Sequence, residues 1–553
     1  MKTKGTFAII QLTRMGDLVQ TIQAGRELKE SYPEINLKII ARKSFGSALG
    51  FLLEKVFDEI ILIDKKTLIT DNLENSLQNI NSFIQEPRLQ NIDVLINLSF
   101  CETSNYLSSI LEPKHRLGTF INKWNQVEVK DQWSQLIYSM VMGGPACPFN
   151  LVDIYKSILG VTSRKVWDKQ ERNNGNPFTL GLHPFASSNK KKWKIKKWSE
   201  VIYKVLKSSP KIKILIFGSE NERQEVEEIL NLPSLKRFEH QIENWVGKLT
   251  LEKTFYKIKE CSHFVGHDSL LGHLAKEANI PSITVSLGTV RPIETAPYGI
   301  NTFVVSPKTK CFPCFPNTEC NFFQCHADIS YQAIAEIVKG FVLEDDINVT
   351  KLKNEVSPFH LDAIKIQRYG PTESGWYASQ DLDKDSSNIK EVFRDISRVA
   401  LLYKMEGIEE NISFPVLNES IASSLGHNAK GVEQLYQLAE FGKKYSHDVI
   451  KEIAKTSPSM TEIKRLGDKI EEVDRLMDLM VKAYPILNPI ISFYKVIKSN
   501  LKGNNIVEIS ESSHNVYQDN GILCSIIYEL ISSTLNNFDK NNKGQKKNQE
   551  GSL

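Results

Sequence analysis

Strand and helix patterns alternate twice along the first part of this 553-residue sequence, and only helical patterns follow them. Short apolar, β-branched runs that end at glycine or polar turns are separated by segments of helical spacing, which is typical of α/β domains. The length exceeds what one hydrophobic core serves, so two or three domains are expected. The sequence therefore predicts an α/β protein with two Rossmann-like domains facing across a cleft, followed by an all-α C-terminal domain.

The first α/β domain is expected over residues 1–172. An apolar strand over residues 6–12 runs into the turn 13–17, and apolar residues then recur at helical spacing, which is how a Rossmann-like domain opens. Further strands are expected at residues 36–41, 60–63 and 93–98. The turn-rich stretch 173–177 is the expected domain boundary.

The second α/β domain is expected over residues 173–343, with strands at 178–183, 211–217, 262–265, 282–287 and 302–305. Its most informative stretch is 262–287, where Gly266, Asp268 and Ser269 supply turn chemistry between a strand and a helix. The start of such a helix favours an anion, such as a pyrophosphate, at the carboxyl ends of the strands. The same turn also occurs in α/β proteins that bind no ligand there.

The character of the sequence changes after about residue 343. Residues 344–388 are polar and are expected to be a linker, and residues 389–538 carry helical periodicity without strand signals. This helical domain has no resemblance to a known family and its role is open. Residues 539–553 form a basic, low-complexity segment that is expected to be disordered.

Composition restricts the class of protein. The chain is 41% hydrophobic and 24% charged, with a formal net charge of +3, which is ordinary for a globular protein and too small to indicate nucleic-acid binding. The sequence has no apolar run near the roughly 18 residues that span a bilayer, and no long apolar leader at its start. We therefore expect a cytoplasmic protein with at most peripheral membrane contact.

Several short motifs, in their order and spacing, resemble the heptosyltransferase-type family 9 glycosyltransferases over roughly residues 5–340. These enzymes have the GT-B fold. The motifs are Arg14-Met-Gly-Asp17, His183-Pro-Phe-Ala-Ser-Ser-Asn-Lys-Lys-Lys-Trp193, Gly218-Ser-Glu-Asn-Glu-Arg223, Gly247-Lys-Leu-Thr-Leu251 and Gly266-His-Asp-Ser-Leu-Leu-Gly-His-Leu-Ala275. The resemblance implies an inverting transfer of a sugar, in this family a heptose, from a nucleotide diphosphate donor such as ADP-heptose.

The resemblance implies that Asp17 is the catalytic base, which takes the proton of an acceptor hydroxyl as that hydroxyl attacks the anomeric carbon. The alternative is that Asp17 only caps its helix. Arg14 is expected to bind a phosphate or carboxylate of the acceptor, or to pair with Asp17. The acceptor is a lipopolysaccharide core sugar or a protein hydroxyl.

The donor site is expected to need no metal, because Lys191 and Lys192 can neutralise the departing diphosphate. Ser187 is expected to donate to a phosphate oxygen, and Glu222 to accept from ribose hydroxyls. The alternatives are a solvated basic face for the lysines and ordinary N-terminal charge placement for Glu222.

The turn and helix after residue 267 are expected to line the pyrophosphate through Asp268, Ser269, Gly272 and His273. His273 could instead be a core histidine. One departure from the family is that Leu270 stands where the family usually has glycine, next to the phosphate. The alternative function is therefore a catalytically silent GT-B-fold scaffold or interaction protein.

Four cysteines lie within fifteen residues in the loop 311–325: Cys311, Cys314, Cys320 and Cys325. Four thiolates that open with a Cys-x-x-Cys pair can close a tetrahedral site for structural zinc or iron. Unliganded cysteines packed beside phenylalanines are the alternative. The C-terminal helical domain could dock a protein acceptor or mediate oligomerisation.

Overall fold

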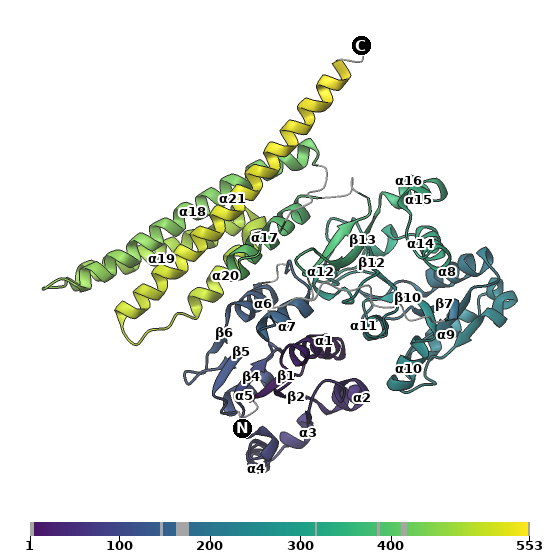
Figure 1. Cartoon of the computed structure of the whole chain (residues 1–553), viewed down its shortest axis with the longest axis horizontal. Coiled ribbons are helices and arrows are strands. Elements are labelled where there is room, and N and C mark those ends of the chain that lie inside the picture. Colours follow the sequence, from purple (N-terminus) through teal and green to yellow (C-terminus); the bar gives the residue numbers. More distant parts are fainter. Residues whose placement is uncertain are drawn as a thin grey trace. The chain divides into compact units, whose positions relative to one another are not determined.

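The computed structural model describes residues 5–143, 147–161, 176–315, 318–383, 388–410 and 417–550. The chain forms two compact units, of which the first contains residues 1–127 and 149–383 and the second contains residues 128–148 and 384–553. The first unit is α/β and the second is helical (Figure 1).

The first sheet has six strands in the order β3-β2-β1-β4-β5-β6. Strands β3 to β5 pair in parallel on both sides of β1, which is the Rossmann order. The strands are β1 Thr6–Gln11, β2 Asn36–Arg42, β3 Glu59–Ile63, β4 Val94–Asn97, β5 His115–Ile121 and β6 Val127–Lys130. The helices of this half are α1 Met15–Ser31, α2 Lys43–Leu53, α3 Lys65–Leu68, α4 Leu73–Ile84, α5 Glu102–Ile110 and α7 Leu151–Ile158.

The second sheet has eight strands in the order β14-β13-β12-β11-β10-β7-β8-β9. The six strands from β9 to β12 pair in parallel and repeat the Rossmann order around β7. The strands are β7 Asn176–His183, β8 Lys213–Ile216, β9 Ile242–Asn244, β10 Cys261–His267, β11 Ser282–Val285 and β12 Thr302–Pro307. Two Rossmann-like sheets in one unit confirm the predicted fold.

Helices cover the second sheet because each presents one apolar face to it. In α8, the buried side chains Trp198, Val201, Ile202 and Val205 recur at helical spacing and join the core of this half. The helices of this half are α8 Ile195–Ser208, α9 Arg223–Leu230, α10 Leu251–Ile258, α11 Leu270–Glu277, α12 Pro292–Thr295, α13 Gln324–Asp328, α14 Tyr331–Glu344, α15 Val349–Glu355 and α16 Pro358–Leu361.

The prediction of a linker over residues 344–388 is wrong for its described part. Strands β13 Ile364–Pro371 and β14 Tyr377–Asp381 extend the second sheet by antiparallel pairing to β12. The polar composition was misleading because Lys365, in β13, is buried against Asp381 of β14 at 2.8 Å. The apolar residues between these charges, Trp376 and Tyr377, are also fully buried.

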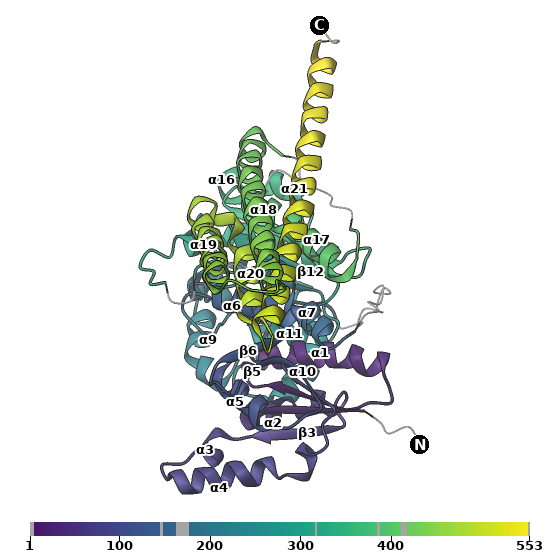
Figure 2. The ribbon, with the colours of Figure 1, turned by 90° about the vertical axis from the view of Figure 1, so that its left-hand side faces the viewer.

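The second unit is a helical assembly in which α18 and α21 lie side by side (Figures 1 and 2). The two helices are antiparallel, because Gly442 faces Tyr517 and Gly426 faces Leu535. The helices are α6 Gln132–Gly143, α17 Ile389–Glu406, α18 Glu419–Ile453, α19 Met460–Ala483, α20 Asn488–Ser499 and α21 Ile506–Glu550. This unit confirms the predicted all-α region.

Residues 128–148 belong to the helical unit, although the sequence suggested one continuous domain over 1–172. Helix α6 packs on α20. The indole N–H of Trp133 donates to Glu406 at 2.6 Å, and the backbone N–H of Val129 donates to Asn500 at 2.7 Å. Both contacts join residues far apart in the sequence, so local patterns could not reveal them.

Two other predicted boundaries have different outcomes. The boundary at residues 172–173 lies outside the described residues. The segment expected to be disordered from residue 539 is instead a continuation of α21, which ends at Glu550. Among the described residues, the chain has no helix with the length and apolar character needed to cross a membrane.

Candidate functional site

The first turns of α1 and α11 meet where the two Rossmann-like halves join. Helix α11 packs on α1, and a methyl group placed on Gly16 would lie 3.4 Å from the ring of His273. Both turns follow the carboxyl ends of parallel strands, which is where α/β proteins bind their ligands. We call residues 12–17 the α1 turn and residues 267–270 the α11 turn.

The α11 turn carries a closely paired acid and base. The ammonium of Lys191 lies 2.7 Å from a carboxylate oxygen of Asp268, and both side chains are largely buried. Burial by itself raises the pKa of Asp268, but the charge of Lys191 and the hydrogen bond from it outweigh burial and keep the pKa below its usual range. The pair is therefore charged and sits at the start of α11.

Lys192 points elsewhere. Its ammonium bonds both carboxylate oxygens of Glu225, in α9, at 2.8 and 2.9 Å. Of the two lysines named from the sequence, Lys191 alone is paired with the α11 turn among the described contacts. Ser187, in the same loop, is exposed. We call residues 187–194 the lysine loop.

Ser269 is bonded to a histidine from another strand. It is the N-cap residue of α11 but makes no side-chain cap bond; its hydroxyl lies 2.9 Å from Nδ1 of His183, at the end of β7. The other ring nitrogen of His183 lies 3.9 Å from a carboxylate oxygen of Glu222. A chain of three polar side chains thus runs along the carboxyl ends of β10, β7 and β8.

Glu222 is also engaged by its own turn. Its carboxylate accepts the backbone N–H of Ser219 at 2.6 Å and the Ser219 hydroxyl at 2.9 Å. Burial acts to raise the pKa of Glu222, but His183 and these bonds outweigh it and lower that pKa. The arrangement is a capping box, so the ordinary structural role of this glutamate is present whether or not it contacts a ligand.

His273 lies between the two turns. It is 6% exposed, and its Nδ1 atom has no hydrogen-bond partner among the described residues. Burial lowers the pKa of His273, although the charges of Asp268 and Asp17 favour its proton. This histidine is therefore neutral and keeps one unpaired ring nitrogen beside both carboxylates.

The two remaining positions of α11 are sterically ordinary. Leu270 is its first residue and is partly exposed, with a backbone that does not require glycine. A methyl group on Gly272 would lie 3.5 Å from the ring of Pro297, which is a normal contact. Neither residue is strained in this structure.

The α1 turn is more open than the α11 turn. The Thr13 hydroxyl lies 2.6 Å from a carboxylate oxygen of Asp17 and 2.6 Å from the Gln11 side chain. Asp17 is the third residue of α1, whose N-cap Arg14 makes no side-chain cap bond. Arg14 is exposed, and no ion pair joins it to Asp17 among the described residues. Among the described contacts, the Asp17 carboxylate thus bonds the Thr13 hydroxyl and no backbone N–H of α1.

A buried polar network holds the two halves together near these turns. The ammonium of Lys156, in α7, is 2% exposed, pairs with Glu27 of α1 and donates to the Tyr298 hydroxyl at 2.9 Å. Tyr298 in turn donates to Asp153 at 2.6 Å, and Asp153 accepts the backbone N–H of Tyr377 at 2.7 Å. Local sequence patterns do not reveal this network, because its members come from four distant segments.

The four cysteines of the loop 311–325 are free thiols, of which Cys325 is buried and Cys311 is exposed. Burial raises the pKa of Cys314, and the three other thiols raise it further, which means that all four lie near one another. Among the described residues, however, no group of three or more His, Cys, Asp or Glu side chains is arranged to hold a metal ion. The four predicted cysteine ligands therefore lie near one another, but their described arrangement is not that of a metal site.

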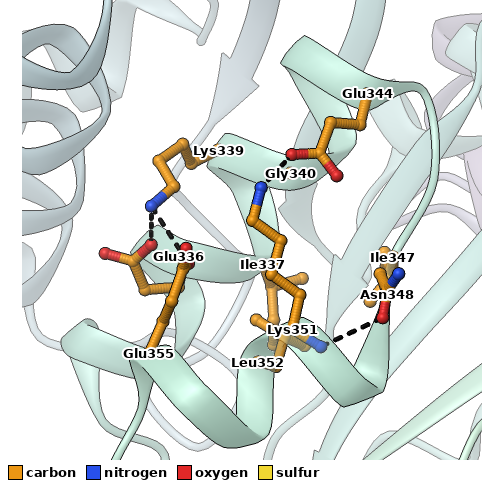
Figure 3. Close-up of a pocket in the computed structure, with 10 residues that line it drawn as sticks. All are labelled: Glu336, Ile337, Lys339, Gly340, Glu344, Ile347, Asn348, Lys351, Leu352 and Glu355. Carbon is orange, nitrogen blue, oxygen red and sulfur yellow. Dashed lines mark hydrogen bonds and ion pairs between the residues drawn. The ribbon is translucent and has the colours of Figure 1, made fainter.

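A small, shallow pocket lies elsewhere, between α14 and α15 (Figure 3). Lys339 pairs there with Glu336 and Glu355, and Lys351 pairs with Glu344. Because these charges already satisfy one another and none belongs to either turn, this pocket is not the candidate site.

Comparisons with known proteins agree with the motif analysis over the second half. The sequence profile of glycosyltransferase family 9 (heptosyltransferase) matches residues 151–322. This stretch contains the lysine loop and the α11 turn but not Asp17. Comparison with curated proteins gives no match.

Three solved structures illustrate the structural similarity. E. coli ADP-heptose lps heptosyltransferase II is 18% identical with a TM-score of 0.45, over 62% of this chain and 99% of that chain. A family 9 glycosyl transferase from Veillonella parvula is 15% identical with a TM-score of 0.47, over 62% and 99%. The dodecameric iron-containing heptosyltransferase TibC from enterotoxigenic E. coli is 16% identical with a TM-score of 0.34, over 58% and 67%.

The described chain has the GT-B arrangement of two Rossmann-like halves, with an added helical unit, and its residues 151–322 match the profile of a glycosyltransferase family. Within that class, the resemblance to glycosyltransferase family 9 that the motifs predicted is confirmed over residues 151–322.

Proposed function

We propose that this protein is an inverting glycosyltransferase that moves a heptose, or a similar sugar, from ADP-heptose to a lipopolysaccharide core or a protein acceptor in the cytoplasm. The observation that carries the proposal is the meeting of the two turns at His273. A buried, neutral imidazole with one unpaired nitrogen lies close to Gly16 and near both Asp17 and Asp268. A buried polar atom of this kind needs a partner, which a ligand or a water molecule can supply.

In this proposal, the α11 turn holds the diphosphate of the donor. The start of α11 offers backbone N–H groups and a favourable dipole to an anion. Lys191 supplies the positive charge that a departing diphosphate needs, and Ser269 and His273 supply polar contacts. Ser187 is the proposed donor to a phosphate oxygen. Lys192, which pairs with Glu225, is proposed to help neutralise the diphosphate, and Glu222 is proposed to accept from the ribose hydroxyls.

Asp17 is the proposed base. As an acceptor hydroxyl forms its bond to the anomeric carbon, Asp17 takes the proton, and the bond from that carbon to the diphosphate breaks with its electron pair leaving on the diphosphate. A single displacement of this kind inverts the anomeric centre. Arg14, exposed beside Asp17, is the proposed contact for an acidic group on the acceptor.

The donor is tested by calorimetry on the full chain. We expect ADP and ADP-heptose to bind and UDP to bind at least about tenfold more weakly, since ADP-heptose is the proposed donor. Tighter binding of UDP-sugars would replace the proposed donor. If no nucleotide or nucleotide sugar binds, the catalytically silent scaffold becomes the better reading.

The reaction is tested by product analysis. We expect ADP release from ADP-heptose in the presence of a lipopolysaccharide core acceptor or an acceptor protein. The sugar in the product is expected to have the opposite anomeric configuration to the donor, read by nuclear magnetic resonance. Retention of configuration would contradict the role of Asp17 as a base in a single displacement.

For the cysteine loop we propose a structural zinc or iron site at Cys311, Cys314, Cys320 and Cys325, outside the reaction. The support is the gathering of four thiols, the residue type that both metals prefer. Elemental analysis of the purified protein tests it, with about one metal ion per chain expected for wild type. Loss of that metal in Cys314→Ser is expected, and a metal-free wild type with all four thiols titratable would contradict the proposal.

A further inference from the structure

His267 is the last residue of β10 and precedes Asp268 directly. Its side chain is 1% exposed. Its ring makes three hydrogen bonds, to the backbone of the lysine loop, to α8 and to the end of β11.

The ring nitrogens have distinct partners. Nε2 lies 3.1 Å from the backbone nitrogen of Trp193 and 3.1 Å from the indole nitrogen of Trp198, and Nδ1 lies 2.9 Å from the backbone oxygen of Val285. Both partners of Nε2 can only donate, so Nε2 is the acceptor and the proton is on Nδ1, which donates to Val285. The partners thus define the tautomer.

The ring stays neutral under physiological conditions. Burial lowers the pKa of His267 to about 3, and the bond to the Val285 oxygen offsets this only in part. Protonation would place a second hydrogen against the two N–H groups that Nε2 accepts. The bonding pattern therefore persists across the pH range in which the protein works.

The segments held by His267 lead to the charged pair of the α11 turn. Trp193 lies in the lysine loop two residues after Lys191, and Trp198 lies in the first turn of α8. Both indoles are fully buried, and their rings lie edge to face at 5.4 Å. On the other side, Asp268 is the next residue after His267 and is the partner of Lys191.

The imidazole of His267 therefore ties the loop, two residues after Lys191, to the strand end that precedes Asp268. A second histidine, His326, also holds this loop: its ring bonds the backbone oxygen of Lys190 at 2.9 Å, and its backbone oxygen accepts the indole N–H of Trp193 at 3.2 Å. Of these two histidines, His267 is the one that directly precedes Asp268, the partner of Lys191.

We propose that His267 is a positioning residue of the donor site: its neutral ring sets the lysine loop against the end of β10, so that Lys191 is presented to the diphosphate of a nucleotide sugar. The identity of the ligand in this inference rests on the proposed function. The ordering of the loop by His267 is independent of that function, because it is a property of the ligand-free protein.

Two variants and one matched control test the role. His267→Leu keeps an apolar side chain of similar size but leaves the N–H groups of Trp193 and Trp198 without an acceptor. His267→Gln keeps an acceptor and a donor at the end of its side chain. The control is His263→Leu, on the same strand, where a histidine that is 3% exposed pairs with Asp345 at 3.0 Å.

The first measurement is hydrogen exchange of residues 187–194 in ligand-free protein. We expect His267→Leu to speed exchange there about tenfold, His267→Gln to restore most of the protection, and the control to match wild type in this loop. Unchanged exchange in His267→Leu, or an equal increase in the control, would overturn the proposal.

The second measurement is the Kd for ADP by calorimetry. His267→Leu is expected to weaken ADP binding about tenfold, while His267→Gln and the control stay within about twofold of wild type. Loss of loop protection in His267→Leu without any loss of ADP affinity would overturn the link to the donor. If wild type binds no ADP, the proposed donor is wrong, and the exchange measurement alone decides whether His267 orders the loop.

If His267→Leu does not fold, both measurements are made on His267→Asn. Its shorter side chain keeps polar atoms but cannot span from Val285 to both tryptophans, so the same direction of change is expected in each.

Discussion

The α1 turn and the α11 turn look alike in sequence, since each places an aspartate near the start of a helix that follows a buried strand. The two turns differ in how many of their charged and polar side chains are already paired with other side chains of the protein. Asp268 is largely buried and paired with Lys191, and Ser269 is bonded to His183. At the α1 turn, Asp17 accepts from Thr13 alone among its described side-chain bonds, and Arg14 is exposed.

This difference suggests a division of work between the halves. A turn whose charges are already placed needs little reorganisation to receive a diphosphate. A turn with free capacity can take its partners from an incoming acceptor. The comparison leads to five predictions, which run from the largest expected effect to the smallest.

The largest effect is expected for the open turn. Asp17→Asn keeps the shape of the side chain but removes the base, so kcat is expected to fall about 10²- to 10⁴-fold. The Kd for ADP is expected to stay within about twofold, because Asp17 is not part of the α11 turn. Initial rates and calorimetry on the same preparation measure both.

Asp64→Asn is the control for that substitution, because Asp64 caps α3 and lies away from either turn. Turnover by Asp17→Asn near the wild-type rate would end the assignment of Asp17 as the base. Loss of ADP affinity in Asp17→Asn would show that the α1 turn also contributes to binding of the nucleotide.

The network that joins the halves comes next. Lys156→Met removes a buried cation and leaves Glu27 and Tyr298 without it. Because the Glu27 side chain is 22% exposed, water offsets part of the loss, and we expect unfolding free energy to fall by about 2–3 kcal/mol. Urea unfolding measures this change. A Lys156→Met variant as stable as wild type would show that the network does not hold the two halves together.

Helix α11 also carries a group whose burial makes stability depend on pH. Burial lowers the pKa of Lys276 to about 7, whereas the unfolded chain keeps that proton up to about pH 10.4. Between these values the unfolded state binds more protons, so stability rises with pH, by about 1 kcal/mol per pH unit.

Urea unfolding of wild type and Lys276→Met at pH 7, 8 and 9 checks this. The difference in stability between the two proteins is expected to favour the variant at pH 7 and to shrink as the pH rises. A difference that does not change with pH would mean that Lys276 keeps its proton when folded.

Substitutions of Lys191 and Lys192 separate the contribution of the lysine that pairs with the α11 turn from that of its neighbour. Lys191→Ala is expected to weaken ADP binding about tenfold, since a charged hydrogen-bond donor is lost. Lys192→Ala is expected to change it about twofold, because Lys192 is directed to Glu225. Equal losses in calorimetry would place both lysines on the diphosphate.

The smallest effects are expected at the departures from the family motif. Leu270→Gly and Gly272→Ala are each expected to change the Kd for ADP by less than about threefold, because neither backbone is strained and Gly272 has room for a methyl group. A Leu270→Gly variant that binds ADP tenfold more tightly would instead show that Leu270 obstructs the donor.

Much of the fold could be predicted from the sequence, for a physical reason. Buried parallel strands and amphipathic helices leave periods of their own, and the order β1–α1 and β10–α11 followed from runs such as residues 6–12 and 262–287. Where pairing is between distant segments, local patterns failed. Lys365 and Asp381 look like a solvated linker until β13 and β14 bring them together inside the second sheet.

The candidate site divides in the same way. Asp17, Asp268, Ser269 and His273 follow from motif positions at strand ends, because the carboxyl ends of parallel strands lie on one edge of a sheet. The sequence by itself thus determined two Rossmann-like halves and the edge where their chemistry lies. Only the tertiary structure decided that Lys191, and not Lys192, pairs with Asp268, and that His267 joins the lysine loop to β10. These pairings join side chains that are tens of residues apart in the sequence, and neither motif spacing nor composition contains that information.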